Sequence, residues 1–121
     1  MGHIHQLVRV SADNAVTVRM LVDTGATFSV IPQALARAVG VKPLRRPITV
    51  TLADGRRVKL DPGTAIFRIG RREAPATILV GDVVEPVLGV ETLEALGLTV
   101  DPQKRRLAPS RQYAVRLGGS R

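Results

Sequence analysis

The stretch Leu21-Val22-Asp23-Thr24-Gly25-Ala26-Thr27 carries most of the information about fold and function in this sequence. It delivers an aspartate from an apolar segment into a turn of small residues. A carboxylate at the end of a strand is costly unless it is solvated or accepts hydrogen bonds, and Gly25 lets the backbone approach closely enough to donate to it. Thr24 and Thr27 add short hydroxyl side chains. The pattern therefore predicts an aspartate that is held in a fixed position for chemistry.

The same turn has other interpretations, and the surrounding sequence decides among them. Asp23 could simply begin an ordinary turn, as aspartate often does before Thr-Gly. The Asp-x-Gly-Thr phosphate loop of sugar kinases and actin-like ATPases needs two lobes, whereas 121 residues accommodate one domain. A dinucleotide-binding turn needs Gly25 to open a helix, whereas Phe28-Ser29-Val30-Ile31 is predicted as a strand. Chain length and local pattern thus exclude both nucleotide-binding alternatives.

A second informative stretch is Pro86-Val87-Leu88-Gly89-Val90-Glu91-Thr92-Leu93, which follows the first by more than sixty residues. Two apolar residues and a glycine precede a short predicted helix, and the glycine indicates a close approach of two backbones. Between the two stretches, Asp54-Gly55 separates two alternating segments, residues 48–52 and 57–60. An Asp-Gly pair in this position is a strong signal for a β-hairpin.

The remaining pattern predicts a single compact domain that is mainly β, over residues 1–109, followed by a tail at 110–121. The tail is expected to form a strand in a dimer or to be flexible. Aromatic residues are rare, so the core is expected to be aliphatic. The predicted strands cover residues 4–10, 15–22, 28–31, 48–52, 57–60, 64–69 and 76–80, the predicted helices cover 33–39 and 91–96, and 98–100 is expected to pair with 106–108.

Composition excludes several classes of function. The chain has no cysteine, which removes disulfides, thiol catalysis and cysteine-based zinc sites. His3 and His5 share one face of a predicted strand, but no further ligand is nearby, so no metal site is expected. Ser29 has no plausible histidine partner for a serine triad. No apolar run reaches the roughly 18 residues of a membrane span and no signal-peptide core is present, so a cytoplasmic location is expected.

The formal net charge is +8, from 15 Arg and 3 Lys against 10 acidic residues. Eight of the arginines form four doublets at or near predicted turns, which is typical of a solvated surface. With three aromatic residues there is little on which nucleic-acid bases could stack. A basic β-domain that binds nucleic acid remains an alternative, on charge alone.

Together, DTGAT after an apolar strand, a hairpin in mid-chain and VLG before a helix resemble the retropepsin-like aspartic proteases. The resemblance covers about residues 7–108. The group includes retroviral proteases, DNA-damage-inducible retropepsin-like domains and small prokaryotic forms, and the segment LGVETLEALGLTVD is most similar to the prokaryotic forms. The resemblance implies the acid protease fold, a closed β-barrel with one or two short helices and a flap hairpin around Asp54-Gly55.

The resemblance also implies a mechanism. Such proteases are homodimeric endopeptidases without a cofactor, and each chain would contribute one Asp23 to a dyad that activates water against a peptide bond. Thr24 would hydrogen-bond across the dimer, with Gly25 beside it. A catalytically weak or inactive dimer that only binds peptides is the alternative within this fold. The residues expected to contact a polypeptide substrate are Gly25, Ala26, Thr27, Ala53, Asp54, Gly55 and Val87.

Overall fold

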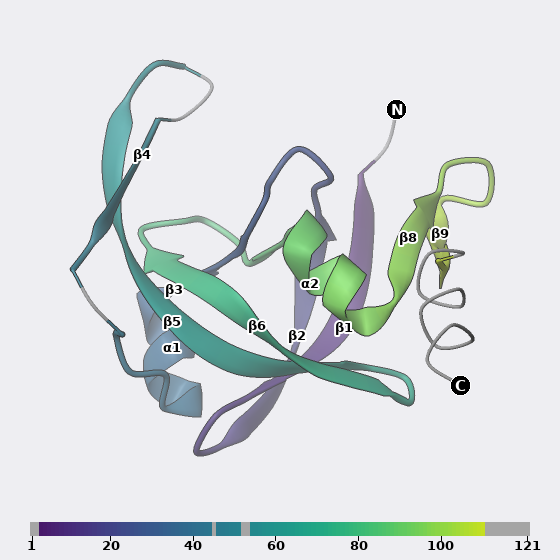
Figure 1. Ribbon diagram of the computed structural model, residues 1–121, viewed down its shortest axis with the longest axis horizontal. Helices are drawn as coiled ribbons and strands as arrows, with labels where there is room; N and C mark the ends of the chain where they lie inside the picture. Colours follow the sequence, from purple (N-terminus) through teal and green to yellow (C-terminus); the bar gives the residue numbers. More distant parts are fainter. Residues whose placement is uncertain (1–2, 45, 52–53, 111–121) are drawn as a thin grey trace, which may run out of the picture.

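The structure is a computed structural model that describes residues 3–44, 46–51 and 54–110 (Figure 1). The elements in chain order are β1 (Ile4–Ser11), β2 (Ala15–Val22), β3 (Ser29–Pro32), α1 (Gln33–Val39), β4 (Ile48–Thr51), β5 (Arg57–Ile69), β6 (Arg72–Gly81), β7 (Val87–Leu88), α2 (Val90–Leu96), β8 (Leu98–Asp101) and β9 (Arg106–Pro109). Both predicted helices are present, and each predicted strand lies within an observed strand or overlaps one, whereas β7 is an additional short strand that was not predicted.

One sheet closes on itself to form the body of the molecule. Its strands follow the order β1-β2-β7-β3-β6-β5-β4, and a further pairing of β1 with β5 joins the two sides into a ring. The β4–β5 hairpin extends beyond this ring as an arm (Figure 1). The mainly β, ring-closed architecture predicted for the chain is therefore confirmed. The paired strands β8 and β9 form a separate two-stranded sheet.

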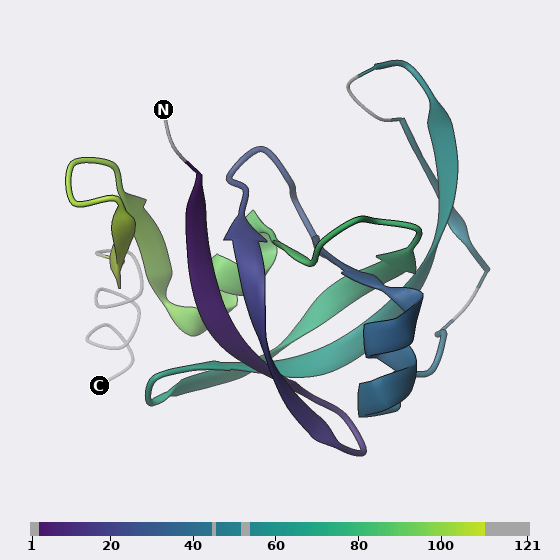
Figure 2. The ribbon, with the colours of Figure 1, turned by 180° about the vertical axis from the view of Figure 1, so that it is seen from behind.

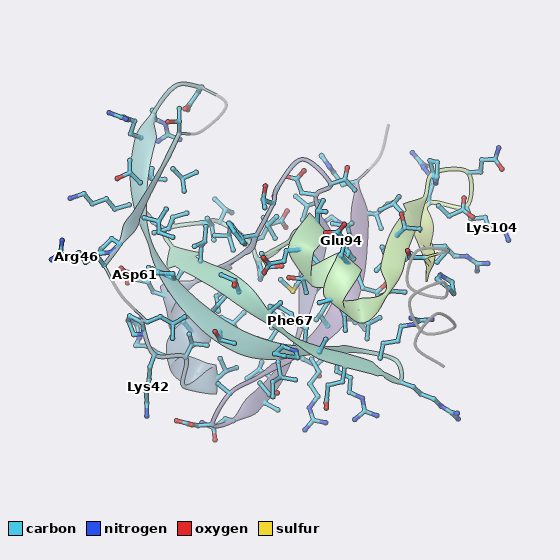
Figure 3. All side chains as sticks on the ribbon, in the orientation of Figure 1. Lys42, Arg46, Asp61, Phe67, Glu94 and Lys104 are labelled. Atoms are coloured by element: carbon cyan, nitrogen blue, oxygen red, sulfur yellow. The ribbon has the colours of Figure 1, made fainter. Side chains whose placement is uncertain are left out.

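The core lies inside the ring because residues of one parity along each strand point inward. On β1 and β2, Val8, Val10 and Met20 are fully buried, while their sequence neighbours are exposed or half-buried. Phe67 of β5 is also fully buried, at the centre of the molecule in Figure 3. As expected from the composition, the rest of this core is aliphatic.

Strand β5 differs from the prediction of two separate strands at 57–60 and 64–69. It runs without interruption through Pro62 and Gly63 because its partner changes at that point. The pairing with β4 ends at Leu60, and the pairing with β6 begins at Asp61. The Leu44 backbone N–H donates to the Pro62 carbonyl. Strand β6 is likewise longer than predicted, which confines the turn after β5 to Gly70 and Arg71.

Each helix ends at a glycine that directly follows its predicted range and adopts the left-handed backbone conformation. Gly40 follows α1 with φ of 84° and Gly97 follows α2 with φ of 72°. The turn between β1 and β2 caps α1, because the backbone and side-chain amides of Asn14 donate to carbonyls of its last turn. Arg72 of β6 does the same for α2, since its guanidinium donates to the carbonyls of Leu96 and Gly97.

Within the described residues, no helix is long and apolar enough to cross a membrane. The predicted tail beyond residue 110 lies outside the described residues.

Candidate active site

The turn after β2 and the β4–β5 arm stand on the same side of the molecule (Figure 2). The turn is the indigo loop that follows β2, and the arm is the teal hairpin that rises beyond the ring. Two of the predicted site elements, the turn that holds Asp23 and the arm that holds Asp54, therefore share one side of the molecule, although β3 and α1 lie between them in the sequence. Within the described residues, no hydrogen bond or ion pair joins the arm to this turn.

Asp23 is exposed, and its side chain is held by the backbone of its own turn. The Gly25 N–H donates to Asp23 Oδ1 over 2.9 Å, and the Ala26 N–H donates to the Asp23 carbonyl over 3.1 Å. The Asp23 N–H in turn donates to the Leu88 carbonyl over 3.0 Å. The sequence prediction of a carboxylate held by Gly25 is confirmed. One carboxylate oxygen is oriented in this way, and the side chain faces solvent.

The second informative stretch completes this turn. Strand β7 lies parallel to β2, with Leu21 opposite Val87 and Val22 opposite Leu88. Beyond β7, the Val90 N–H donates to the Ala26 carbonyl over 2.8 Å. The two stretches singled out in the sequence are therefore neighbours in space.

Gly89 lies where these two backbones approach most closely. A Cβ atom placed on Gly89 would lie 2.5 Å from the Phe28 carbonyl carbon, 2.6 Å from the Phe28 oxygen and 2.9 Å from the Ala26 oxygen. Only a residue without a side chain fits, which confirms the close approach expected from the VLG pattern. The space around Asp23 is thus set by backbone packing against β7 and α2.

A buried hydroxyl pair supports the same contact and was missed at the sequence level. The Oγ atoms of Ser29 and Thr92 lie 2.6 Å apart, and both residues are fully buried. Ser29 Oγ also accepts the Gly89 N–H over 2.9 Å. These bonds join β3 to Gly89 and to the start of α2. The only sequence signal was a polar residue inside an apolar strand, which does not reveal its partner.

Glu91 is a second residue that sequence reasoning did not identify. Its Oε1 accepts the Thr77 backbone N–H over 3.1 Å, and its own N–H donates to the Thr27 carbonyl over 2.9 Å. Thr77 lies one residue before the segment of β6 that pairs with β3. The Glu91 carboxylate therefore accepts a backbone N–H at the point where the β3–β6 pairing ends. Through this side chain and its own N–H, Glu91 connects α2 to the sheet and to the Asp23 turn.

The other predicted site residues are distributed as follows. Thr24, Gly25 and Thr27 are exposed around Asp23, and Ala26 is half-buried. Val87 is half-buried on β7, opposite Leu21 and Val30. Asp54 and Gly55 lie in the arm, and Ala53 lies outside the described residues.

The tip of the arm is organised by Asp54 and Arg56. The Arg56 backbone N–H donates to Asp54 Oδ1 over 3.0 Å, and its guanidinium Nε donates to Oδ2 over 2.7 Å. These two bonds hold the pKa of the Asp54 carboxyl below its ordinary value. Gly55 between them has φ of 87°, a conformation that glycine adopts without strain. The pair closes the turn on itself.

This pair predicts a titration that nuclear magnetic resonance can follow. Because the pKa is lowered, the ion pair stabilises the folded state at pH values above the ordinary pKa of aspartate. This stabilisation is lost as the pH falls through the pKa of the folded state. The Asp54 carboxyl should therefore titrate below an aspartate in an unstructured peptide. Arg56→Gln should raise the midpoint of the Asp54 titration. Arg57→Gln, which removes an equal charge at the adjacent position, should raise it less. Equal shifts in both variants would contradict the assigned cause.

His5, at which no metal site is expected, lies beside an acidic residue. His5 Nε2 lies 3.6 Å from Glu85 Oε2, in the loop that leads into β7. Among residues 3–44, 46–51 and 54–110, no three histidine or acidic side chains gather as a metal site would require.

Neither of the two surface hollows near α1 and β4 includes Asp23 in its lining. Asp23 lies on an open surface of the single chain.

Comparison with known proteins agrees with this geometry. Residues 8–95 match the family described as "gag-polyprotein putative aspartyl protease". Among solved structures, the chain is similar to EIAV protease complexed with the inhibitor HBY-793, with a TM-score of 0.70 and 21% sequence identity over 83% of this chain and 93% of that chain. No match was found among curated proteins. The family match spans both the Asp23 turn and the Gly89 contact, so the chain belongs to the retropepsin-like aspartic proteases.

Proposed function

We propose that the protein is an aspartic endopeptidase that acts as a homodimer. The observation that carries the proposal is the Asp23 carboxylate, which is exposed and oriented by the Gly25 N–H in a turn braced by Gly89. A carboxylate with only a turn-forming role would not need a second segment packed beneath it. Membership in the family and the retroviral protease fold support the same reading.

A dimer follows from the number of carboxylates. The chain supplies one DTGAT turn, whereas acid–base catalysis on a peptide bond by carboxylates needs two groups about 3 Å apart that share one proton. A two-fold axis beside Asp23 would bring its symmetry mate to it. The open surface around Asp23, Thr24 and Thr27 leaves room for that second copy.

In the proposed reaction, the ionised Asp23 of one protomer takes a proton from a water molecule, which attacks the scissile carbonyl carbon. The protonated Asp23 of the partner donates its proton to the carbonyl oxygen. Because the pair titrates as a unit, activity requires the singly protonated dyad and is expected to favour mildly acidic pH. The role of Gly25 is to keep the base in place.

The substrate is proposed to be an extended polypeptide that lies between the Asp23 turns and the two arms. Val50 and Val58 are opposite each other on the arm and half-buried, and Val87 lies beside the turn. These side chains would offer apolar contacts, while the extended substrate pairs through its main chain. Closure of the arm would exclude water other than the nucleophile.

A mixing experiment tests the shared site. Wild type and Asp23→Asn are unfolded, mixed in equal amounts and refolded together, and cleavage of a peptide library is compared with wild type at the same total concentration. Random pairing leaves about one quarter of the dimers with two carboxylates, so the rate should fall to about one quarter. A rate of about one half would indicate that single chains are active. Peptide binding by wild type without turnover would favour the binding-module alternative.

A further inference from the structure

Three exposed arginines lie on the outer face of adjacent strands, away from the core. Arg19 is on β2, Arg9 on β1 and Arg68 on β5, and each is of the parity that points out of the ring. Nitrogen-tipped side chains project from the side of the molecule opposite the arm in Figure 3. We call this surface, with its two exposed aliphatic residues Leu7 and Ile66, the arginine face.

The strand register places these charges close together. Arg9 is directly opposite Arg68 in the antiparallel β1–β5 pairing. Arg19 is opposite Leu7, so it lies diagonally from Arg9 across the β1–β2 pairing. Directly opposed residues have Cβ atoms about 5 Å apart and diagonal ones about 7 Å, and like charges in such positions repel. The free chain therefore carries an unfavourable concentration of positive charge on this face.

No ion pair within residues 3–44, 46–51 and 54–110 involves Arg9, Arg19 or Arg68. The ion pairs found there join His5 to Glu85 and Arg56 to Asp54, and neither involves the arginine face. Glu73 is opposite Arg68 on β6 and shares this face without forming an ion pair, so it offsets part of the charge and leaves three arginines against one acidic residue. Arg68 donates its Nε to the Gly70 carbonyl, which leaves the guanidinium charge in place. An anionic partner would relieve the repulsion.

The aliphatic residues indicate which kind of anion fits. Leu7 is 62% exposed and lies between the arginines on β1 and β2, and Ile66 is 40% exposed two positions from Arg68. A phosphodiester backbone offers no apolar surface to such residues, and Phe67 on the neighbouring position is fully buried and unavailable for stacking on bases. A polypeptide with interspersed acidic and aliphatic side chains complements both features.

We propose that the arginine face is a docking site for an acidic polypeptide segment that also carries aliphatic side chains, outside the proposed cleft. Arginine suits this role because its planar guanidinium binds carboxylates through two parallel hydrogen bonds. Leu7 and Ile66 bury apolar area against the aliphatic side chains of the segment. The proposal does not depend on turnover at Asp23.

Binding of a defined probe tests the proposal. The probe is a short fluorescein-labelled peptide of Glu, Leu and Ser, measured by fluorescence anisotropy with the Asp23→Asn protein so that no cleavage can occur. The triple variant Arg9→Gln, Arg19→Gln, Arg68→Gln should weaken binding by about tenfold or more, because three charge-assisted contacts are lost. Added salt should weaken binding to the unaltered face and have less effect on the triple variant.

The matched control removes the same charge elsewhere. Arg37, Arg105 and Arg106 are exposed on α1 and around the β8–β9 turn, and changing all three to Gln should leave the affinity within about twofold. A probe with Gln in place of Glu should bind weakly to every protein. Equal loss of affinity in both triple variants, equal binding of the Gln probe, or tighter binding of an oligothymidylate that depends on the same arginines would overturn the proposal. So would an absence of any binding by the acidic probe.

Discussion

Asp23→Asn is expected to abolish peptide cleavage, lowering kcat by about a thousandfold or more. The amide has nearly the shape of the carboxylate, and its oxygen still accepts the Gly25 N–H that holds Asp23 Oδ1 in the unaltered protein. It cannot take a proton from water, and a dimer that carries two amides cannot share one. The expected result is therefore a folded protein without turnover, measured as initial rates on a peptide library and as thermal unfolding of the same samples.

Asp82→Asn provides the matched control for this prediction. Asp82 is also exposed, and it lies in the loop between β6 and β7, so its replacement removes the same charge outside the Asp23 turn. Activity should remain within about twofold of wild type, since an exposed charge of this kind contributes little. Cleavage by Asp23→Asn at the wild-type rate would remove the proposed mechanism, and an equal loss in both variants would assign the effect to net charge.

Gly89→Ala is expected to have the largest effect on stability. Its backbone has φ of −96°, which any residue adopts, so the penalty comes from space alone. The added Cβ would meet the backbone of Phe28 and Ala26, which cannot move without breaking the bond from the Val90 N–H to the Ala26 carbonyl. Overpacking typically costs 1–3 kcal/mol, and contacts with backbone place this case at about 3 kcal/mol or more. Urea unfolding followed by circular dichroism measures the loss.

Gly70→Ala is the control, because it introduces the same methyl group where nothing lies within 4 Å. Gly70 has φ of 61°, so alanine there carries only the left-handed backbone penalty of about 1 kcal/mol. Both variants should be compared at one protein concentration, since dimer formation would couple stability to concentration. The assigned packing is wrong if Gly89→Ala is no more destabilising than Gly70→Ala.

Local sequence pattern was sufficient for most elements. The helix at 33–39, the glycines that end both helices and the hairpin around Asp54 depend on short-range rules that the chain follows. The pattern of DTGAT and VLG also predicted that two distant stretches meet. This is because a glycine that must admit another backbone leaves a recognisable signature, and here it is Gly89.

Other features depend on partners that no local pattern specifies. Strand β5 continues through Pro62 because its first part pairs with β4 and the part from Asp61 onward pairs with β6. The bond between Ser29 and Thr92 joins residues 63 positions apart, and either residue alone looks like an ordinary polar residue. The arginine face exists only because the register sets Arg9 against Arg68. Such features require the pairing of the strands to be known first.

The contacts beneath Asp23 also have a consequence for biosynthesis. The Asp23 turn is completed by Leu88, and Ser29 reaches Gly89 across 60 positions of sequence. Contacts of such long separation form late, because the intervening chain must be closed first. A nascent chain that has emerged only as far as the β4–β5 arm therefore lacks the segment that braces its carboxylate. On the ribosome, the Asp23 turn can reach its braced geometry only after synthesis has passed Gly89 and the start of α2.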